Sequence, residues 1–429
     1  MNSRECASPE CIVEKSPKLF GMDVERGRWL LVLAGMAINL CLGSIFSWSV
    51  FVQPVKDFFT VEGFRVSENQ ALMPFSIFFA ALSITMLFAG RAIEKFGPKR
   101  TCLAGGILTG LGWIISSFAT SPDLLDLSFG ILGGMGGGIA FSCTMAVAAK
   151  WFPDRSGLAA GLTVFGFGFS AFIVANVAGY LIPVYGLVST FRIIGIVLMI
   201  VVSLLSSVLL FPPAGWTPAK GSLNKSKAQI AVRQFTREEM VGTSSFYSLF
   251  ICYFIGAFSG LAAIGISHEV GVEIIGFNPG QATLAVGLFA VCNALGRPAF
   301  GLILDRFQPK VAAMLSFSLI CISSLVLYFA GRNNIAVFIA AFSILWACYG
   351  GWVTISSASI AKFFGTVHYA RCYGVAYLAS GTAALAGPQL AGLIDAMTDS
   401  YIDFFPVLAS FAVAGFLISH FTLKPPASN

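Results

Sequence analysis

The chain has 429 residues, of which 57% are hydrophobic and 11% charged, and its mean hydropathy is +0.84. A soluble domain carries about 25% charged residues, so a soluble protein of this composition would expose large apolar patches. A membrane-spanning helix needs about 20 apolar residues, and twelve of them would take roughly 240 residues. The composition excludes an ordinary soluble protein and predicts an all-α, polytopic membrane protein.

Charge and cysteine content narrow the class further. The net charge is +6, but the basic residues fall in loops between apolar stretches, so we expect no nucleic-acid partner. The ten cysteines form no C-x-x-C pair and mostly lie within apolar stretches, where a thiol acts as a small hydrophobe. We expect no metal site, no disulfide framework and no cofactor. Residues 1–28 lack the apolar core of a signal peptide and are interpreted as a cytoplasmic tail.

Twelve apolar stretches of roughly membrane-spanning length follow in chain order. The longest polar interior segment, residues 212–243, divides them six and six. The prediction is a bundle of six helices over 29–211, a cytoplasmic linker, a second bundle over 244–421 and a short cytoplasmic tail, 422–429. The twelve stretches are 29–51, 71–89, 102–120, 124–148, 157–181, 188–211, 244–266, 281–304, 311–330, 335–358, 372–394 and 402–421.

The distribution of Lys and Arg predicts the orientation. With the N-terminus inside the cell, most of the 26 basic residues fall in inward segments, including Lys220, Lys225 and Lys227 of the linker. The outward segments hold Lys56, Arg65, Arg192 and Arg332. Acidic residues show no such bias, as the positive-inside rule requires. Both termini are therefore expected in the cytoplasm, and the protein in the plasma membrane or bacterial inner membrane.

The two halves repeat one another. Residues 90–100, after the second stretch, correspond to 301–310 after the eighth, and 149–152 correspond to 361–364 at nearly the same offset. A parallel repeat of this kind is typical of transporters with a midplane site between two halves. Glycine spacings such as Gly157–Gly161 favour close helix packing.

Residues 90–100 resemble the cytoplasmic loop signature of the major facilitator superfamily, and the likeness extends over residues 29–421. It implies the twelve-helix fold of that family and a conformational latch made by charges at the cytoplasmic end. Gln308 replaces the usual glycine in the second copy, so a weaker latch is expected there. The latch residues are Gly90, Glu94, Lys95, Gly97, Arg100, Asp305 and Arg306.

Arg297 is the basic residue placed deepest in a predicted helix, and no acidic residue is expected at its depth. Charge in mid-membrane is costly, and arginine does not lose its proton. An anionic substrate would be its counter-ion, and Asn293, one turn earlier on the same face, would position the guanidinium or a substrate oxygen. The alternative is that Arg297 snorkels toward the interface at Asp305, roughly 12 Å away along the helix.

Aromatic and hydroxyl side chains in other helices complete the candidate substrate site. An aromatic cage with a few hydroxyls around one arginine suits a small carboxylate with an apolar tail. The alternative is that these aromatics only pack the bundle or anchor it at the interface. The candidates are Phe46, Trp48, Tyr349, Tyr373, Tyr377 and Ser380.

Residues 43–51 and 150–159 look like two sequence motifs of the oxalate–formate antiporter branch of the superfamily. In the oxalate carriers of that branch, a lysine at the position of Ser380 joins the arginine in gripping a dianion. The single charge left here resembles instead the branch's bacterial lactate and pyruvate carriers and the more distant monocarboxylate transporters. Asn293 stands where the latter carry an aspartate linked to proton coupling.

The leading hypothesis is a secondary carrier of small monocarboxylates, such as L-lactate or pyruvate, working by alternating access around Arg297. One Arg⁺ neutralises one carboxylate, whereas a dicarboxylate would leave net charge in a low-dielectric site. The resemblance implies proton symport. His268 and Glu273, near Glu269, are the candidate proton carriers. The alternative is that these residues form an ordinary solvated loop.

Other functions remain open from the sequence. They are an organic anion exchanger of the oxalate/formate type, a transport-inactive receptor on the same fold and a membrane enzyme. The three histidines share no intramembrane face with acidic residues, so no hydrolytic machinery is visible and no enzyme is expected. We expect the carrier to act as a monomer in the lipid bilayer, with the anion and H⁺ as its partners.

Overall fold

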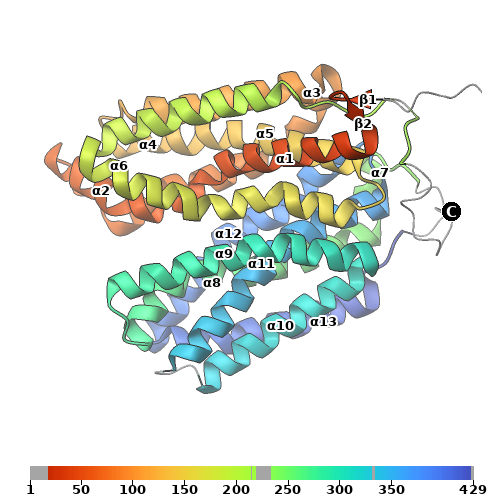
Figure 1. Cartoon of the computed structure of the whole chain (residues 1–429). Coiled ribbons are helices and arrows are strands. Elements are labelled where there is room, and N and C mark those ends of the chain that lie inside the picture. The colour runs from red at the N-terminus through yellow and green to blue at the C-terminus, as the bar shows by residue number, and fades with distance from the viewer. Residues whose placement is uncertain (1–17, 214, 219–232, 331–333, 427–429) are drawn as a thin grey trace, which may run out of the picture.

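A computed structural model describes residues 18–213, 215–218, 233–330 and 334–426 (Figure 1). The tail before residue 18, most of the linker and the last three residues lie outside this range. So do Lys220, Lys225, Lys227 and Arg332, on which part of the orientation argument depends. In the part described, the chain is almost entirely helical.

The N-terminal half starts with a short antiparallel hairpin and continues in long helices. Asp23 caps the first helix, because its carboxylate accepts a hydrogen bond of 2.8 Å from the Glu25 amide. That helix changes to a tighter 3₁₀ turn at Gly43, where the chain crosses the Phe167 backbone. The elements are β1 Lys18–Leu19, β2 Met22–Asp23, α1 Val24–Leu42, η1 Gly43–Ser47, α2 Ser49–Val61, α3 Glu68–Ser116, α4 Pro122–Leu125, η2 Asp126–Gly133, α5 Gly134–Trp151 and α6 Ser156–Ser206.

The C-terminal half follows the linker and its short helix α7. Its second long helix begins with a capping box, in which Asn278 and Gln281 exchange side-chain and backbone hydrogen bonds. The elements are α7 Arg237–Val241, α8 Ser244–Glu269, η3 Val270–Ile274, α9 Pro279–Arg306, α10 Pro309–Ala330, α11 Ile335–Phe364, α12 Tyr369–Thr398, η4 Tyr401–Asp403 and α13 Phe404–Thr422.

Nine helical segments in the described ranges are long and apolar enough to cross a membrane. Two of them, in α3 and α6, are 47 and 51 residues long and contain a glycine with non-helical backbone. Gly97 and Gly186 both have φ of 78°, a left-handed conformation that favours glycine, so each of these helices folds back as two arms. In the second half, the turn that corresponds to the one at Gly97 has extended backbone at Phe307.

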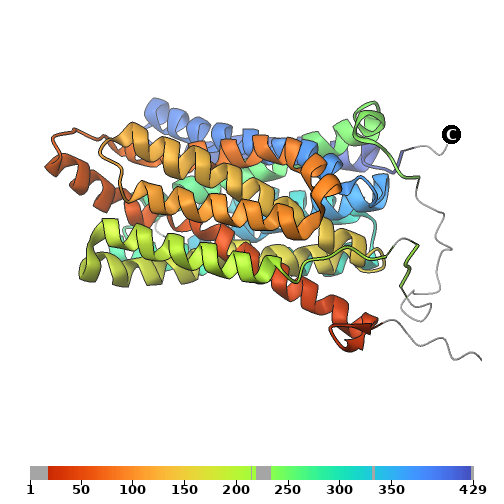
Figure 2. The ribbon, with the colours of Figure 1, turned by 90° about the horizontal axis from the view of Figure 1, so that it is seen from above.

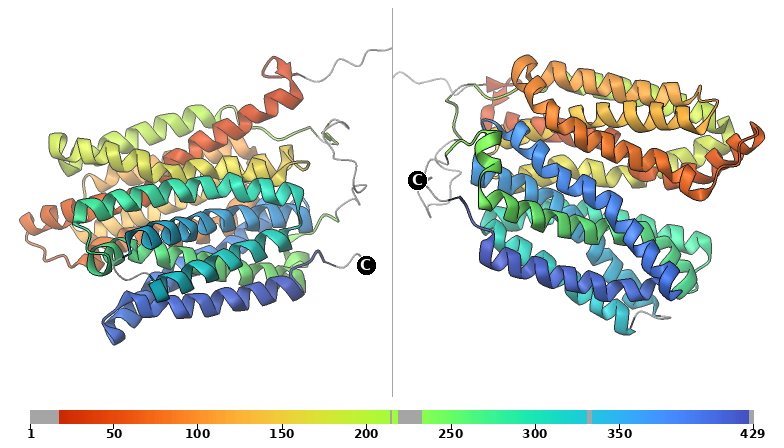
Figure 3. Two further views of the ribbon diagram at one scale, coloured as in Figure 1. Left: turned by 60° about the horizontal axis from the view of Figure 1, so that its bottom comes forward. Right: turned by 180° about the vertical axis from the view of Figure 1, so that it is seen from behind.

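Two helical bundles lie side by side, with the N-terminal half above the C-terminal half in Figure 1. Figure 2 shows the long helices running along a common direction, and Figure 3 shows the same division from two further sides. We call the end with β1, β2 and α7 the linker end and the opposite end, with Gly63, Gly186 and Gly276, the far end. Helix α6 packs along α9, and α3 along α12, so these pairs join the halves.

The first helix begins at Val24, so residues 24–28 of the predicted tail are helical. Arg28 is 2% exposed and forms a bidentate pair with Asp154, with N–O distances of 2.7 and 2.9 Å. It also donates to the Trp151 carbonyl oxygen at 3.0 Å. The predicted tail thus ends in a buried ionic contact that fixes α1 to the end of α5.

Candidate substrate site between the halves

Arg297 lies in α9 at the contact between the halves and is 1% exposed. Its Nη1 donates to the Val164 carbonyl oxygen of α6 at 2.7 Å. Its Nε and Nη2 donate to Asn293 Oδ1 at 3.2 and 3.0 Å. These contacts lie toward the far end from Arg297, whereas Arg306 marks the linker end. The side chain therefore does not snorkel, and that alternative is wrong.

In the described structure, carbonyl oxygens and an aromatic ring lie closest to the charge of Arg297. Within the described residues, no carboxylate forms an ion pair with it. A guanidinium has five N–H donors, and the bonds to Val164 and Asn293 need three of them. The Phe167 ring lies 5.8 Å from the guanidinium carbon. A buried cation without an anionic partner is costly, so the site favours binding of an anion.

Gly168 allows α6 to approach this pair. A Cβ atom at residue 168 would lie 2.9 Å from Arg297 Nε and 2.9 Å from Asn293 Oδ1. Any larger side chain would push the guanidinium or the amide out of place. The sequence alone does not indicate this role for Gly168, Val164 or Phe167, because only the crossing of α6 over α9 makes them neighbours of Arg297.

A cavity of about 580 Å³ lies between the halves and includes Asn293 in its wall. It runs along α6 and α9 toward the far end, where Leu284 in its rim is 77% exposed. Phe46 and Trp346 line it, and the Trp346 indole N–H has no acceptor among the described residues. The cavity thus leads from the far end to the Arg297–Asn293 pair.

Four buried tyrosines surround Arg297 on the side of the C-terminal half. Tyr253, Tyr349, Tyr373 and Tyr377 all interact electrostatically with its charge. Tyr373 and Tyr377 pack edge to face with ring centroids 5.8 Å apart. Three of the four are sequence candidates, whereas Tyr253 of α8 was missed. Its position on the inner face of α8 has no periodicity signal, since α8 is apolar all round.

Ser380 lies near the hydroxyls of Tyr253 and Tyr349 and is fully buried. The Tyr253 hydroxyl interacts with Ser380 and Ser356, and the Tyr373 hydroxyl with Ser356, so these polar groups form one buried cluster. The structure places Ser380 beside Tyr253 and Tyr349.

Trp48 and Phe46, which are close in sequence, have different surroundings. The Trp48 indole donates to the Ala71 carbonyl at 2.9 Å, and its ring packs against Phe129 and Phe191 inside the N-terminal half. Trp48 does not line the cavity, so its prediction as a substrate contact is corrected to packing. Phe46 contacts Phe167 with ring centroids 5.3 Å apart, which connects the cavity wall to Arg297.

His268 and Glu273 lie at the far end of α8 and in η3, inside a helix that continues beyond its expected end. Fifteen residues separate His268 from Tyr253, roughly 22 Å along the helix axis. Glu273 is exposed and, with Glu269, interacts with Tyr401 rather than with Arg297. The structure does not bring these candidates to the substrate site.

The linker end is closed by two contacts between the halves. Asp305 of α9 accepts hydrogen bonds from the Gly157 and Leu158 amides at 2.8 and 2.9 Å, at the start of α6. These amides belong to a helix N-terminus, which attracts a carboxylate. Gly157 and Gly301 touch backbone to backbone there, as the glycine spacing indicated.

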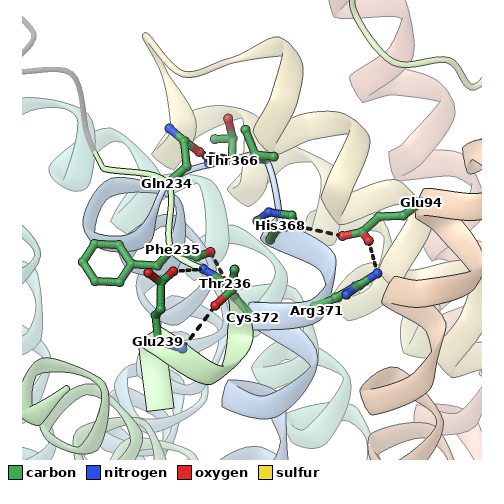
Figure 4. A network of polar contacts seen from close by, with 10 residues as sticks. Glu94, Gln234, Phe235, Thr236, Glu239, Thr366, His368, Arg371 and Cys372 are labelled. Atoms are coloured by element: carbon green, nitrogen blue, oxygen red, sulfur yellow. Dashed lines mark hydrogen bonds and ion pairs between the residues drawn. The ribbon is translucent and has the colours of Figure 1, made fainter. Parts of the chain in front are cut away.

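The second contact joins α3 to α12 and is shown in Figure 4. Glu94 forms an ion pair with Arg371 and lies 3.3 Å from Nδ1 of His368. Gly90 lets the helices meet, because a Cβ there would lie 2.9 Å from the Arg371 Cα. The sequence identified Glu94 but not its partners, since the signature itself carries no information about α12.

The basic residues of the predicted latch do not pair. Lys95 lies over the Phe96 ring at 5.1 Å, and Arg100 and Arg306 are exposed. No ion pair to any of these three is found in the described ranges. Pairing therefore rests on Glu94 and Asp305, and the part of the prediction that included Lys95, Arg100 and Arg306 is corrected.

The end of the linker is fixed to the same region (Figure 4). Gln234 Oε1 accepts from the Thr366 and Val367 amides at 2.9 and 3.0 Å. In α7, the Thr236 amide and then the Arg233 guanidinium lower the pKa of Glu239 by hydrogen bonding to its carboxylate. The last residues of the linker are thus an ordered part of the C-terminal half.

Comparison with known proteins decides the family. The Major Facilitator Superfamily matches the chain over residues 29–270 and 249–429. The chain belongs to this family. It is therefore a multi-pass membrane transporter and not an enzyme.

Two individual relatives agree with this family. The oxalate:formate antiporter of Oxalobacter formigenes is 28% identical over 371 residues, 86% of this chain and 85% of that protein. Apicoplast pyruvate carrier 1 of Toxoplasma gondii is 23% identical, with 94% of this chain and 92% of that protein covered. Oxalate–formate and monocarboxylate carriers are thus both among its relatives, as the sequence motifs indicated.

The fold agrees with a solved structure of the same family. The crystal structure of the fucose:proton symporter of E. coli has a TM-score of 0.70 to this chain at 16% identity. The match covers 92% of this chain and 99% of that one. At this identity the likeness concerns the fold alone.

Proposed function

We propose that the protein carries small monocarboxylates, with L-lactate and pyruvate as the leading substrates. The observation that supports this most strongly is Arg297, a buried cation with no carboxylate partner in the described structure. Its hydrogen-bond partner Asn293 lines a cavity between the halves. One carboxylate would neutralise it, and the apolar wall at Phe46 and Trp346 would accept a short carbon chain.

The residues around Arg297 would bind different parts of the substrate. Arg297 would pair with the carboxylate through N–H groups now held by Asn293 and Val164. Asn293, Tyr349, Tyr373, Tyr377 and Ser380 would surround the substrate and donate to its remaining oxygens. Ser380 stands where a second positive charge would favour a dianion, so its neutral hydroxyl favours a monoanion.

The conformation supports alternating access. The linker end is closed by Asp305 and Glu94, and the cavity extends toward the far end. We propose twelve spans, counting two arms each in α3 and α6 and including α12, with both termini and the linker in the cytoplasm. This state would then face outward, in the plasma membrane or bacterial inner membrane, and the carrier would work as a monomer.

We further propose that a proton accompanies the substrate. The fold is shared with a proton symporter, but the proton-carrying residue must differ from an aspartate at position 293, since Asn293 is present. His268 and Glu273 would exchange protons with the outside at the far end, before substrate reaches Arg297.

Uptake of labelled L-lactate into proteoliposomes, with and without an inward proton gradient, tests the proposal. Pyruvate, oxalate and formate serve as competitors. Gradient-driven uptake inhibited by pyruvate but not oxalate is expected. Exchange of external oxalate for internal formate without lactate uptake would contradict it and favour the second candidate, an anion exchanger like the 28% identical relative.

A further inference from the structure

A second cavity, of about 450 Å³, lies at the linker end of the C-terminal half, away from the substrate site. It is formed where α9 ends, α10 begins, α11 ends and the chain leaves α13. Its volume falls within the roughly 300–1,000 Å³ of small-ligand sites. Its lining residues are Arg306, Phe307, Gln308, Pro309, Lys310, Lys362, Phe363, Leu423 and Pro425.

The charge of this cavity is positive. Arg306, Lys310 and Lys362 line it, and no acidic residue does. The Lys362 ammonium donates to the Leu304 carbonyl, and none of the three cations has an ion pair within the described ranges. Asp305 is nearby, but both its oxygens accept amide hydrogens from α6. Three cations facing one cavity favour an anionic ligand.

The corresponding lysine of the N-terminal half has different surroundings. Lys150 matches Lys362 in the repeat, and its ammonium lies 4.1 Å from the centre of the Phe211 ring. An aromatic ring thus covers the ammonium of Lys150, whereas a cavity lies beside Lys362. The difference between two otherwise related positions indicates that the cavity is not a general consequence of the fold.

The apolar part of the lining favours a lipid over a small soluble anion. Phe307 is 54% exposed at the edge of the cavity, while Phe363 and Leu423 form its buried wall. The position at the ends of the spans is the depth of lipid headgroups, where basic pockets between helices bind anionic phospholipids. A free phosphate would use the cations but leave Phe307 without a partner.

We propose that this cavity binds the phosphate headgroup of an anionic phospholipid. Arg306, Lys310 and Lys362 hold the phosphate, and the start of the acyl chains lies against Phe307. The site does not depend on which substrate the carrier transports.

Native mass spectrometry of the full-length protein with equal amounts of phosphatidylglycerol and phosphatidylcholine of the same chains tests this. Each cation contributes about fivefold to binding, so Lys310→Gln/Lys362→Gln should lose about thirtyfold in phosphatidylglycerol retention. The matched control is Lys95→Gln/Lys99→Gln, which removes two exposed charges at the same end of the other half.

We expect the wild type and the control to retain phosphatidylglycerol selectively. Millimolar inorganic phosphate should not displace it. Equal retention by both double variants would overturn the proposal. So would full displacement by inorganic phosphate, which would assign a soluble-anion site instead. If the double variant does not fold, Lys310→Gln alone should show a loss of about fivefold, and no loss would contradict the proposal.

Discussion

Gly168 has no side chain, and this sets the geometry of the candidate substrate site. A Cβ at position 168 would lie only 2.9 Å from Arg297 Nε and from Asn293 Oδ1. Their geometry therefore depends on α6 as much as on α9. The bonds of Arg297 to both helices make it a contact between the halves, so substrate binding at this residue can bias their relative position.

Gly168→Ala should weaken substrate binding about tenfold, because overpacking by one methyl group displaces the guanidinium. Binding of L-lactate and pyruvate to the purified variant measures the effect. Gly179→Ala is the matched control, since it lies on the same helix and lines the same cavity but has open space around its Cβ. Equal affinity in the two variants would show that the close approach at residue 168 has no role.

Ser380→Lys should shift the preference from monoanions toward dianions. The added ammonium would give the site two positive charges, which suit the two carboxylates of oxalate. Competition by oxalate against lactate uptake measures the change, and inhibition should rise at least tenfold. Ser380→Met controls for side-chain length. Equal oxalate inhibition in the Lys and Met variants would exclude a charge effect.

Arg28 and Asp154 connect elements rather than line a site. Removing one partner of a buried ion pair costs about 3–5 kcal/mol, since the other charge stays buried. Arg28→Gln should therefore lower the free energy of unfolding by about that amount, seen as a lower Tm in detergent. Arg26→Gln, at an exposed position of the same helix, should leave Tm unchanged. A similar Tm in both variants would contradict a structural role of the pair.

At the scale of elements, the sequence predicts what depends on composition and misses what depends on helix neighbours. Hydropathy places the long helices, and the scarcity of charge singles out Arg297. The start of α1 at Val24 was missed because Arg28 and Glu25 are typical of a polar tail, and only Asp154 makes burial of Arg28 favourable. Trp48 was misassigned because a segment motif does not reveal which face of α1 and η1 packs inward. Arg371, His368 and Tyr253 were missed for the same reason, since their roles arise from contacts across α3, α9 and α12.

At the scale of the whole molecule, the two closures of the linker end follow the internal repeat. Glu94 of α3 holds α12, and Asp305 of α9 holds α6, each across the division between the halves. Opening at the linker end must break both contacts.

Glu94→Gln should increase the population open at the linker end about fivefold, because a partly exposed ion pair contributes about 1 kcal/mol. Distances between labels at positions 95 and 367, introduced through non-natural amino acids, report the opening. The exchanged pair Glu94→Arg/Arg371→Glu should restore closure, and Lys99→Gln should leave it unchanged. An unaltered distance distribution in Glu94→Gln would exclude this pair as a latch.

Arg297 is proposed as the counter-charge of the transported carboxylate. Equilibrium binding of L-lactate and pyruvate to purified Arg297→Gln and Arg192→Gln variants measures this role. Arg192 is the matched control because its guanidinium donates to the hydroxyl of Ser117, which follows α3, and does not line the cavity. We predict that Arg297→Gln loses at least thirtyfold in affinity, since a buried charge pair contributes about 2–5 kcal/mol, while Arg192→Gln binds as wild type. Unchanged affinity in a folded Arg297→Gln variant would show that Arg297 does not bind the substrate carboxylate.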